Sequence, residues 1–186
     1  MSWNRPLIIG LIFLLLALGW LRVRSTDTEQ LRRSQLMMGT IVEIVASGES
    51  RGQLEAAIDD AFAEMARLDR LLSRHYQDSD VTRLSQSDKG GRVAPDTAEV
   101  IALGLDVARR SNGAFDLTLG RLKTLWRLDD ESPVVPEHAA IERAIAGIGP
   151  RSLELNGRHL IKRSPQLMVD LGGVAKGYIV DRAIGV

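Results

Sequence analysis

The C-terminal part of the chain contains a dense group of residues that could do chemistry. The stretch "VDLGGVAKGYIVD", Val169–Asp181, brings an aspartate, two adjacent glycines and a lysine together. Glycines leave the main chain open to a ligand, and a helix beginning near Ala175 would point its free N–H groups at an anion. Lys176 adds a positive charge at the same place. The stretch therefore predicts a tight glycine turn that binds phosphate.

The same residues also have a purely structural interpretation. A glycine pair after a strand is usually a turn, with the lysine in solvent and Asp170 capping the helix that follows. The stretch is not a Walker loop, because the spacing between glycines and the Lys-Ser/Thr ending are missing. These residues alone do not decide between the two interpretations.

A second segment, "RRSNGAFDLTLGRLKTLW" (Arg109–Trp126), also contains candidate binding residues. Gly113 and Ala114 are small enough for a close approach to the main chain, and Phe115 can pack against a neighbour. Asp116 is an acid among apolar residues, which is costly unless a partner compensates its charge. The structural alternative is an Asx turn that starts a strand.

Together the two segments resemble the ApbE family of flavin transferases, exported enzymes that use magnesium to cleave FAD and attach FMN to a threonine of a target protein. Four stretches match in family order: "MMGT" (37–40), "LLSRHYQDSDVTRLS" (71–85), "SNGAFDLTLGRLKTLW" (111–126) and "VDLGGVAKGYIVD". Four ordered motifs are much more specific than one. The resemblance implies an FAD:protein FMN transferase whose partner is a flavinylated redox subunit.

The resemblance also implies roles for individual residues. The positions implied to contact FAD are Met38, Tyr76, Ala114, Phe115, Asp116, Asp170 and Lys176, and the Gly173 carbonyl is implied to help hold magnesium. Asp170 and Lys176 are in addition the candidate catalytic residues, the lysine by stabilising the transferring phosphoryl group. Either Asp116 or Asp170 could take the proton of the acceptor hydroxyl. The structural alternatives are a core methionine at 38 and a surface aromatic residue at 76.

The family pattern continues beyond Val186, with a His-x-Ile-Asp-Pro motif and the aspartate and threonine side chains that complete the magnesium site. One carbonyl and water would hold magnesium weakly, so we expect the 186-residue chain to be inactive or nearly so alone. Two other function classes remain open. One is a hydrolase that splits FAD into FMN and AMP, and the other is a non-catalytic, membrane-tethered flavin-binding module.

Composition sets limits on these functions. With 45% hydrophobic and 26% charged residues, the chain can bury a core. Residues 1–24 hold three arginines and no acid, so the remainder carries a net charge of −3 and is a poor bulk binder of nucleic acid. Cysteine is absent, which excludes disulfides, thiolate metal sites and a cysteine nucleophile.

The N-terminal segment, residues 1–24, predicts export or membrane anchoring. Leu7–Leu21 is an uncharged run that would form a helix of about 23 Å, shorter than the roughly 30 Å hydrocarbon core of a bilayer. It fits a signal peptide or a minimal anchor. Trp20 stands where lipoproteins of the family carry cysteine, so lipid attachment is excluded. We expect the protein on the periplasmic side of the bacterial inner membrane, anchored or secreted.

The remaining pattern favours a mixed α and β domain, and the resemblance implies an α+β fold of antiparallel sheets with flanking helices, ApbE-like but incomplete. After a linker at 25–34, residues 35–186 are expected to form the N-terminal portion of an ApbE-like flavin transferase domain. The elements expected are a strand at 36–46, helices at 53–72, 96–111 and 137–148, a short helix near Val81 and a hairpin turning at Asn156-Gly157. The helix at 96 begins with a capping-box pattern, "DTAE", and Asn112-Gly113 provides its stop.

Overall fold

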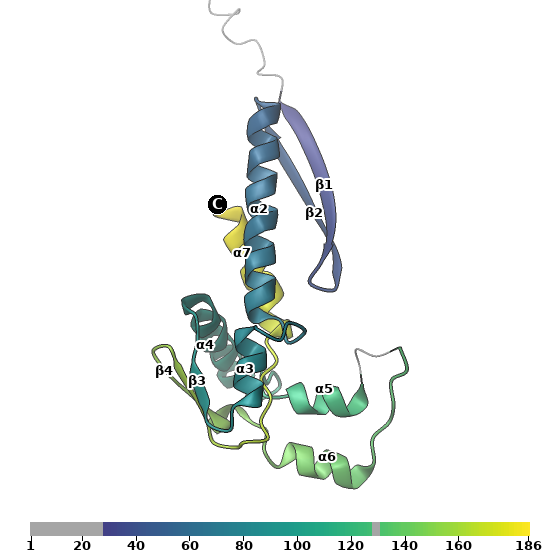
Figure 1. Cartoon of the computed structure of the whole chain (residues 1–186), viewed down its shortest axis with the longest axis vertical. Coiled ribbons are helices and arrows are strands. Elements are labelled where there is room, and N and C mark those ends of the chain that lie inside the picture. Colours follow the sequence, from purple (N-terminus) through teal and green to yellow (C-terminus); the bar gives the residue numbers. More distant parts are fainter. Residues whose placement is uncertain (1–27, 128–130) are drawn as a thin grey trace, which may run out of the picture. The chain divides into compact units, whose positions relative to one another are not determined.

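A computed structural model describes residues 28–127 and 131–186 (Figure 1). The chain divides into two compact units, of which the first contains Glu43–Ile58 and described residues up to Arg33, and the second contains Ser34–Val42 and Asp59–Val186. The segment expected to be a signal peptide or anchor, residues 1–24, lies outside the described residues. Within the described ranges, no helix combines the length and the apolar character needed to cross a bilayer.

The first strands form a two-stranded hairpin of β1 (Glu29–Met37) and β2 (Thr40–Gly48). Met38 and Gly39 make its turn, both with positive φ, 52° and 69°. The single strand expected at 36–46 is therefore wrong, because the turn divides it. Part of the expected linker, from Glu29 onward, belongs to strand β1. Most positions of this strand are exposed, so its polar residues can remain in contact with water.

Helix α2 (Arg51–Leu72) confirms the predicted helix at 53–72. Apolar residues at three- and four-residue spacing form one face of a helix, and that face is expected to be buried. The predicted positions are all buried: Leu54, Ile58, Phe62, Met65, Leu68 and Leu72.

The second unit contains helices around a small antiparallel sheet. In chain order the elements after α2 are α3 (Asp80–Gln86), β3 (Gly90–Arg92), α4 (Pro95–Arg110), α5 (Gly120–Trp126), α6 (His138–Ile145), the 3-10 helix η1 (Pro150–Ser152), β4 (Leu153–Asn156), β5 (His159–Lys162) and α7 (Gly172–Ile184). The strand order is β3-β5-β4, with both pairs antiparallel. Helices α5 and α6 lie side by side, and α4 contacts both β4 and α7 (Figure 1). The α+β prediction with antiparallel sheets is confirmed.

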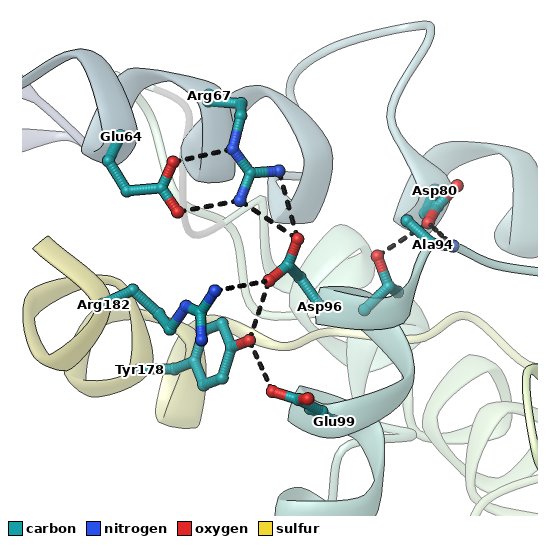
Figure 2. A network of polar contacts seen from close by, with 9 residues as sticks. Glu64, Arg67, Asp80, Ala94, Asp96, Glu99, Tyr178 and Arg182 are labelled. Carbon is teal, nitrogen blue, oxygen red and sulfur yellow. Dashed lines mark hydrogen bonds and ion pairs between the residues drawn. The ribbon is translucent and has the colours of Figure 1, made fainter. Parts of the chain in front are cut away.

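Helix α3, the short helix predicted near Val81, is fixed by a buried acid. Asp80 is 1% exposed, and its Oδ2 accepts hydrogen bonds from the Ala94 amide at 2.7 Å and the Thr97 hydroxyl at 2.6 Å (Figure 2). Arg83 also bonds this carboxylate. Because a buried charge is costly without such partners, Asp80 ties α3 to the start of α4.

Helix α4 begins differently from the prediction. It starts at Pro95 with Ala94 as N-cap and no side-chain cap, because proline fits the first helical position without needing an N–H partner. The capping box expected from "DTAE" is wrong, since Asp96 instead pairs with residues of α2 and α7. The stop at Asn112-Gly113 is confirmed: both residues have positive φ, and the Gly113 amide donates to the Ala108 carbonyl at 2.9 Å.

Two turns near the C-terminus are shifted from their expected places. In the β4–β5 hairpin Asn156 pairs with His159, so the two-residue turn is Gly157-Arg158 rather than Asn156-Gly157. Helix α7 begins at Gly172, three residues before the expected start at Ala175. Gly172 is therefore helical and not part of a preceding turn.

Candidate functional site

The two sequence motifs that carry the predicted chemistry lie side by side through main-chain contacts. The Asp170 amide donates to the Leu117 carbonyl at 2.8 Å, and the Gly120 amide donates to the Met168 carbonyl at 3.1 Å. Leu119 and Met168 form an isolated parallel bridge between these hydrogen bonds. The stretch before α7 and the stretch before α5 thus share one short piece of parallel pairing.

Gly173 is needed for packing. A Cβ atom built at this position would lie 2.7 Å from Cε2 of Phe115, a distance that side chains do not tolerate. The residue is helical, lies outside the left-handed region and is exposed on its other side. The prediction of a sharp glycine turn is therefore wrong: the missing side chain at Gly173 lets the Phe115 ring lie against the start of α7.

Asp170 is the most strongly held acid at this site. Its side chain is 9% exposed. Oδ1 accepts the Gly172 amide at 2.9 Å, and Oδ2 lies 2.7 Å from Nζ of Lys123 and 3.8 Å from Nε of Arg74. This agrees with the structural alternative, in which Asp170 caps the helix: its side chain accepts the first helical amide, although Leu171 is the N-cap residue. Both carboxylate oxygens therefore have partners.

Lys123 and Arg74 were not found by sequence reasoning. Lys123 lies on α5 and Arg74 in the loop after α2, which also carries Tyr76. Both residues lie inside motifs quoted above, but the sequence provides no signal that pairs either with Asp170. The pairing depends on how the chain folds between them.

Asp116 forms an Asx turn. Its Oδ1 accepts the amide and the hydroxyl of Thr118, at 2.8 and 2.7 Å. The Thr118 hydroxyl is buried and accepts the Gly149 amide at 2.9 Å. The turn alternative is thus observed, although it leads into α5 and not into a strand.

The other predicted contact residues lie at accessible positions. Lys176 is exposed on α7, and Ala114 is exposed just before Phe115. Tyr76 is 39% exposed, and Cζ of Arg70 lies 5.7 Å from its ring centroid. Met38 is half-buried in the β1–β2 turn. Of the predicted residues, Phe115 and Gly173 are in close contact, and Asp170 is joined to the first motif through the Leu117 carbonyl and Lys123.

A cavity of about 450 Å³ adjoins this region. The two paired segments contribute Gly120, Met168 and Val169 to its lining. The residues from the loop after α2 and from α3 are Arg74, His75, Thr82, Ser85 and Gln86. Its volume lies within the range of small-molecule sites, and its lining is partly polar.

A second polar cluster holds α7 further along its length (Figure 2). Arg67 donates two hydrogen bonds to Oδ2 of Asp96, both at 3.1 Å, and two to Glu64, at 2.7 and 2.8 Å. The Tyr178 hydroxyl lies 2.9 Å from Oδ1 of Asp96 and 2.7 Å from Oε2 of Glu99. Asp96 thus joins three helices, α2, α4 and α7, that come from different parts of the chain.

The charges and burial of this second cluster shift the pKa values of three of its side chains. Burial alone would raise the pKa of Asp96, but hydrogen bonds from Tyr178 and Arg67 outweigh it and leave that pKa lowered. The Arg67 hydrogen bond likewise lowers the pKa of Glu64. Burial, together with the carboxylates of Glu99 and Asp96, raises the pKa of Tyr178. The carboxyl groups of Asp96 and Glu64 are thus held ionised and the Tyr178 phenol neutral.

The described residues do not by themselves fit a magnesium site. Magnesium needs near-octahedral oxygen ligation. Over residues 28–127 and 131–186, no group of three or more histidines, aspartates or glutamates lies close enough together to hold a metal. The predicted ligand, the carbonyl of Gly173, would be one oxygen of such a set.

Comparison with known proteins places these motifs in a family. The profile of the ApbE family matches residues 38–186. The chain is 28% identical to an FAD:protein FMN transferase of Haemophilus influenzae, over 96% of this chain and 54% of that protein. It is 32% identical to one of Vibrio cholerae, over 95% and 53%.

Solved structures agree with the sequence comparison. The flavin transferase ApbE from Vibrio cholerae superposes with a TM-score of 0.74 at 28% identity, covering 86% of this chain and 53% of that one. The ApbE protein from Thermotoga maritima gives 0.76 at 27% identity, covering 83% and 51%. The chain spans about half the length of the proteins it matches. Its family profile, motifs and fold agree, and the chain belongs to the ApbE family.

Proposed function

We propose that this chain acts in an FAD:protein FMN transferase, which cleaves FAD in a magnesium-dependent reaction and transfers FMN to a threonine of a target protein. The observation that carries the proposal is the joining of the two motifs: Phe115 packs on Gly173, and the Asp170 amide bonds Leu117. The names of the relatives support the same activity. A site built from both motifs can bind one ligand through contacts with each of them.

The proposed contacts to FAD divide by chemistry. Tyr76 and Phe115 offer aromatic rings, and Met38 and Ala114 offer small or apolar contacts near exposed main chain. The N-terminal end of α7, with exposed Lys176 one turn along, favours a phosphate group through its helix dipole and the lysine charge. Asp116 and Asp170 complete the proposed contacts.

The proposed reaction transfers the phosphoryl group of the FMN half from AMP to a threonine oxygen. The threonine oxygen forms a bond to the phosphorus of the FMN half, the pyrophosphate bond breaks, and AMP leaves. The proton of the hydroxyl goes to a base. Because both oxygens of Asp170 already accept hydrogen bonds or ion pairs, Asp116 is the better placed acid for that role. Lys176 would stabilise charge on the phosphoryl group.

A flavin-binding and product assay tests the proposal. The chain is mixed with FAD, magnesium and a threonine-containing acceptor protein, and binding is followed by flavin fluorescence while products are separated. Covalent FMN on the acceptor with matching AMP supports the transferase. FMN and AMP formed equally well without acceptor support the hydrolase. Because the 186-residue chain alone is expected to be inactive, the same assay is run on the whole protein, where FAD bound without AMP supports a binding module. Failure to bind FAD at millimolar concentration would overturn the proposal.

The proposal extends to location and partner. We propose export through residues 1–24 to the periplasmic side of a bacterial inner membrane, anchored or secreted, where a redox subunit receives FMN. The uncharged run Leu7–Leu21 supports this. Cell fractionation of the tagged protein tests it, since recovery in the cytoplasm would contradict export.

A further inference from the structure

We propose that Lys123 is a positioning residue for the candidate site: through its ion pair it holds the Asp170 carboxylate against the first amide of α7. The inference rests on the proposed function, because its consequence is expected in flavin binding. It adds to the predicted site a residue that acts through another one and does not itself touch the ligand.

The carboxylate of Asp170 needs a strong partner. A carboxylate withdrawn from water to 9% exposure is unfavourable unless charge and hydrogen bonds compensate it. Lys123 is the near cation, with Nζ at 2.7 Å, whereas Nε of Arg74 lies at 3.8 Å, beyond hydrogen-bond distance. Lys123 therefore carries most of this compensation.

The position of Lys123 is fixed by the same pairing that joins the two motifs. Helix α5 begins at Gly120, whose amide bonds the Met168 carbonyl, and Lys123 follows one turn later. A Cβ atom at Gly120 would lie 2.8 Å from that carbonyl, so the helix start is held close to the segment leading to Asp170. The ammonium group is thereby aimed at Asp170 by main-chain contacts.

The ion pair in turn orders the start of α7. Oδ1 of Asp170 accepts the Gly172 amide, one of the helix N–H groups that has no partner within the helix. A Cβ atom at Gly172 would lie 3.1 Å from Oδ1 of Asp170 and 3.9 Å from Nζ of Lys123, so the pair lies directly over the first helical residue. Loss of Lys123 frees the carboxylate to turn toward water, and the amide then loses its acceptor.

Amide hydrogen exchange tests the positioning step in the ligand-free protein. We expect Lys123→Met to speed exchange at Gly172 and Gly173, with the rest of α7 little changed. Lys123→Arg should restore slow exchange, because it keeps the charged donor. Arg121→Met is the matched control, since it removes a charge from the same helix and Arg121 has no hydrogen bond or ion pair to the described residues. Unchanged exchange in Lys123→Met would overturn the inference.

Flavin affinity tests whether Lys123 acts through Asp170. We expect Lys123→Met to weaken FAD binding by about threefold to tenfold, since Lys123 is 38% exposed and its pair is partly screened. In an Asp170→Asn background, Lys123→Met should lower FAD affinity by less than about twofold, because the carboxylate charge that pairs with Lys123 has already been removed. An equal loss in both backgrounds would show that Lys123 acts on the ligand directly and would overturn the positioning role.

The two measurements separate this inference from the proposed function. If the unmodified chain binds no FAD, the proposed function fails, and the exchange experiment still decides whether Lys123 orders α7. If FAD binds and Lys123→Met, Lys123→Arg and Arg121→Met all bind it equally, the positioning role fails while the proposed function stands.

Discussion

Helix α7 is held by two polar clusters that differ in construction. At its start, Asp170 is held by one lysine at 2.7 Å and one amide at 2.9 Å. Farther along, Asp96 receives two hydrogen bonds from Arg67 and one contact from the Tyr178 hydroxyl. The side chains of both acids are mostly buried, at 9% and 16% exposure.

The comparison indicates that the Asp96 cluster is structural and that the Asp170 cluster belongs to the candidate binding site. The Asp96 cluster joins three helices through several redundant contacts, so it stabilises the fold. The Asp170 cluster has few contacts and lies beside two exposed glycines, Gly172 and Gly173, where a ligand can reach the main chain. We therefore expect changes in the first cluster to lower stability, and changes in the second to alter flavin binding.

The largest expected effect comes from Asp96→Ala. It leaves Arg67 and Tyr178 without their shared acceptor, and we expect a loss of about 2–3 kcal/mol in the free energy of unfolding. Chemical denaturation measures it. Asp106→Ala on the same helix is the control, because that acid is 40% exposed and should cost less than about 0.5 kcal/mol. Equal losses for the two variants would remove the distinction between the clusters.

The next effect is expected at the other cluster. In Gly173→Ala the new methyl group meets the Phe115 ring, which must move, so we expect FAD affinity to fall about tenfold. Titration by flavin fluorescence measures it. Gly177→Ala is the matched control, because its Cβ has nothing within 4 Å; it should bind FAD normally and gain about 0.5–1 kcal/mol in stability from better helix propensity.

A smaller effect is expected from Tyr178→Phe. It removes the hydroxyl between Asp96 and Glu99, and a loss of about 1 kcal/mol in unfolding free energy is expected. FAD affinity should change less than about twofold, because the start of α7 keeps its own contacts. A tenfold loss of affinity with unchanged stability would reverse the roles assigned to the two clusters.

The smallest effect concerns alkaline pH. Burial and the neighbouring carboxylates raise the pKa of Tyr178 above its ordinary value of 10.0. The folded state then keeps a proton that the unfolded state loses, so this contribution to stability is complete below pH 10 and declines as pH rises further. Denaturation curves at several alkaline pH values should show a shallower decline in Tyr178→Phe. An identical decline in both proteins would contradict the shift.

Local patterns in the sequence were sufficient for some elements. The apolar spacing of Leu54–Leu72 predicted α2, and Asn112-Gly113 predicted the end of α4. Helix α5 was missed because its seven residues are too few to show a periodicity. Strand β3, only Gly90–Arg92, exists through its pairing with β5.

The site was predictable in its motifs and not in its contacts. Phe115, Asp170 and Gly173 were identified, yet the reason for glycine at 173 is packing against a ring far away in sequence. Lys123 and Asp170 are 47 positions apart, and Asp96 and Tyr178 are 82 apart. No local pattern reports such pairs, because charged residues on exposed helix faces look alike until the fold brings some of them together.

The short parallel pairing of Leu117–Gly120 with Met168–Asp170 has a kinetic consequence. The chain must close a loop of roughly 50 residues before these segments meet. Such contacts form late in folding, because the chain loses conformational entropy on closing the loop before the contacts contribute any favourable free energy. In a refolding experiment, flavin uptake is then expected to lag behind the appearance of helical circular dichroism. A peptide carrying either motif alone would have no partner segment to complete it.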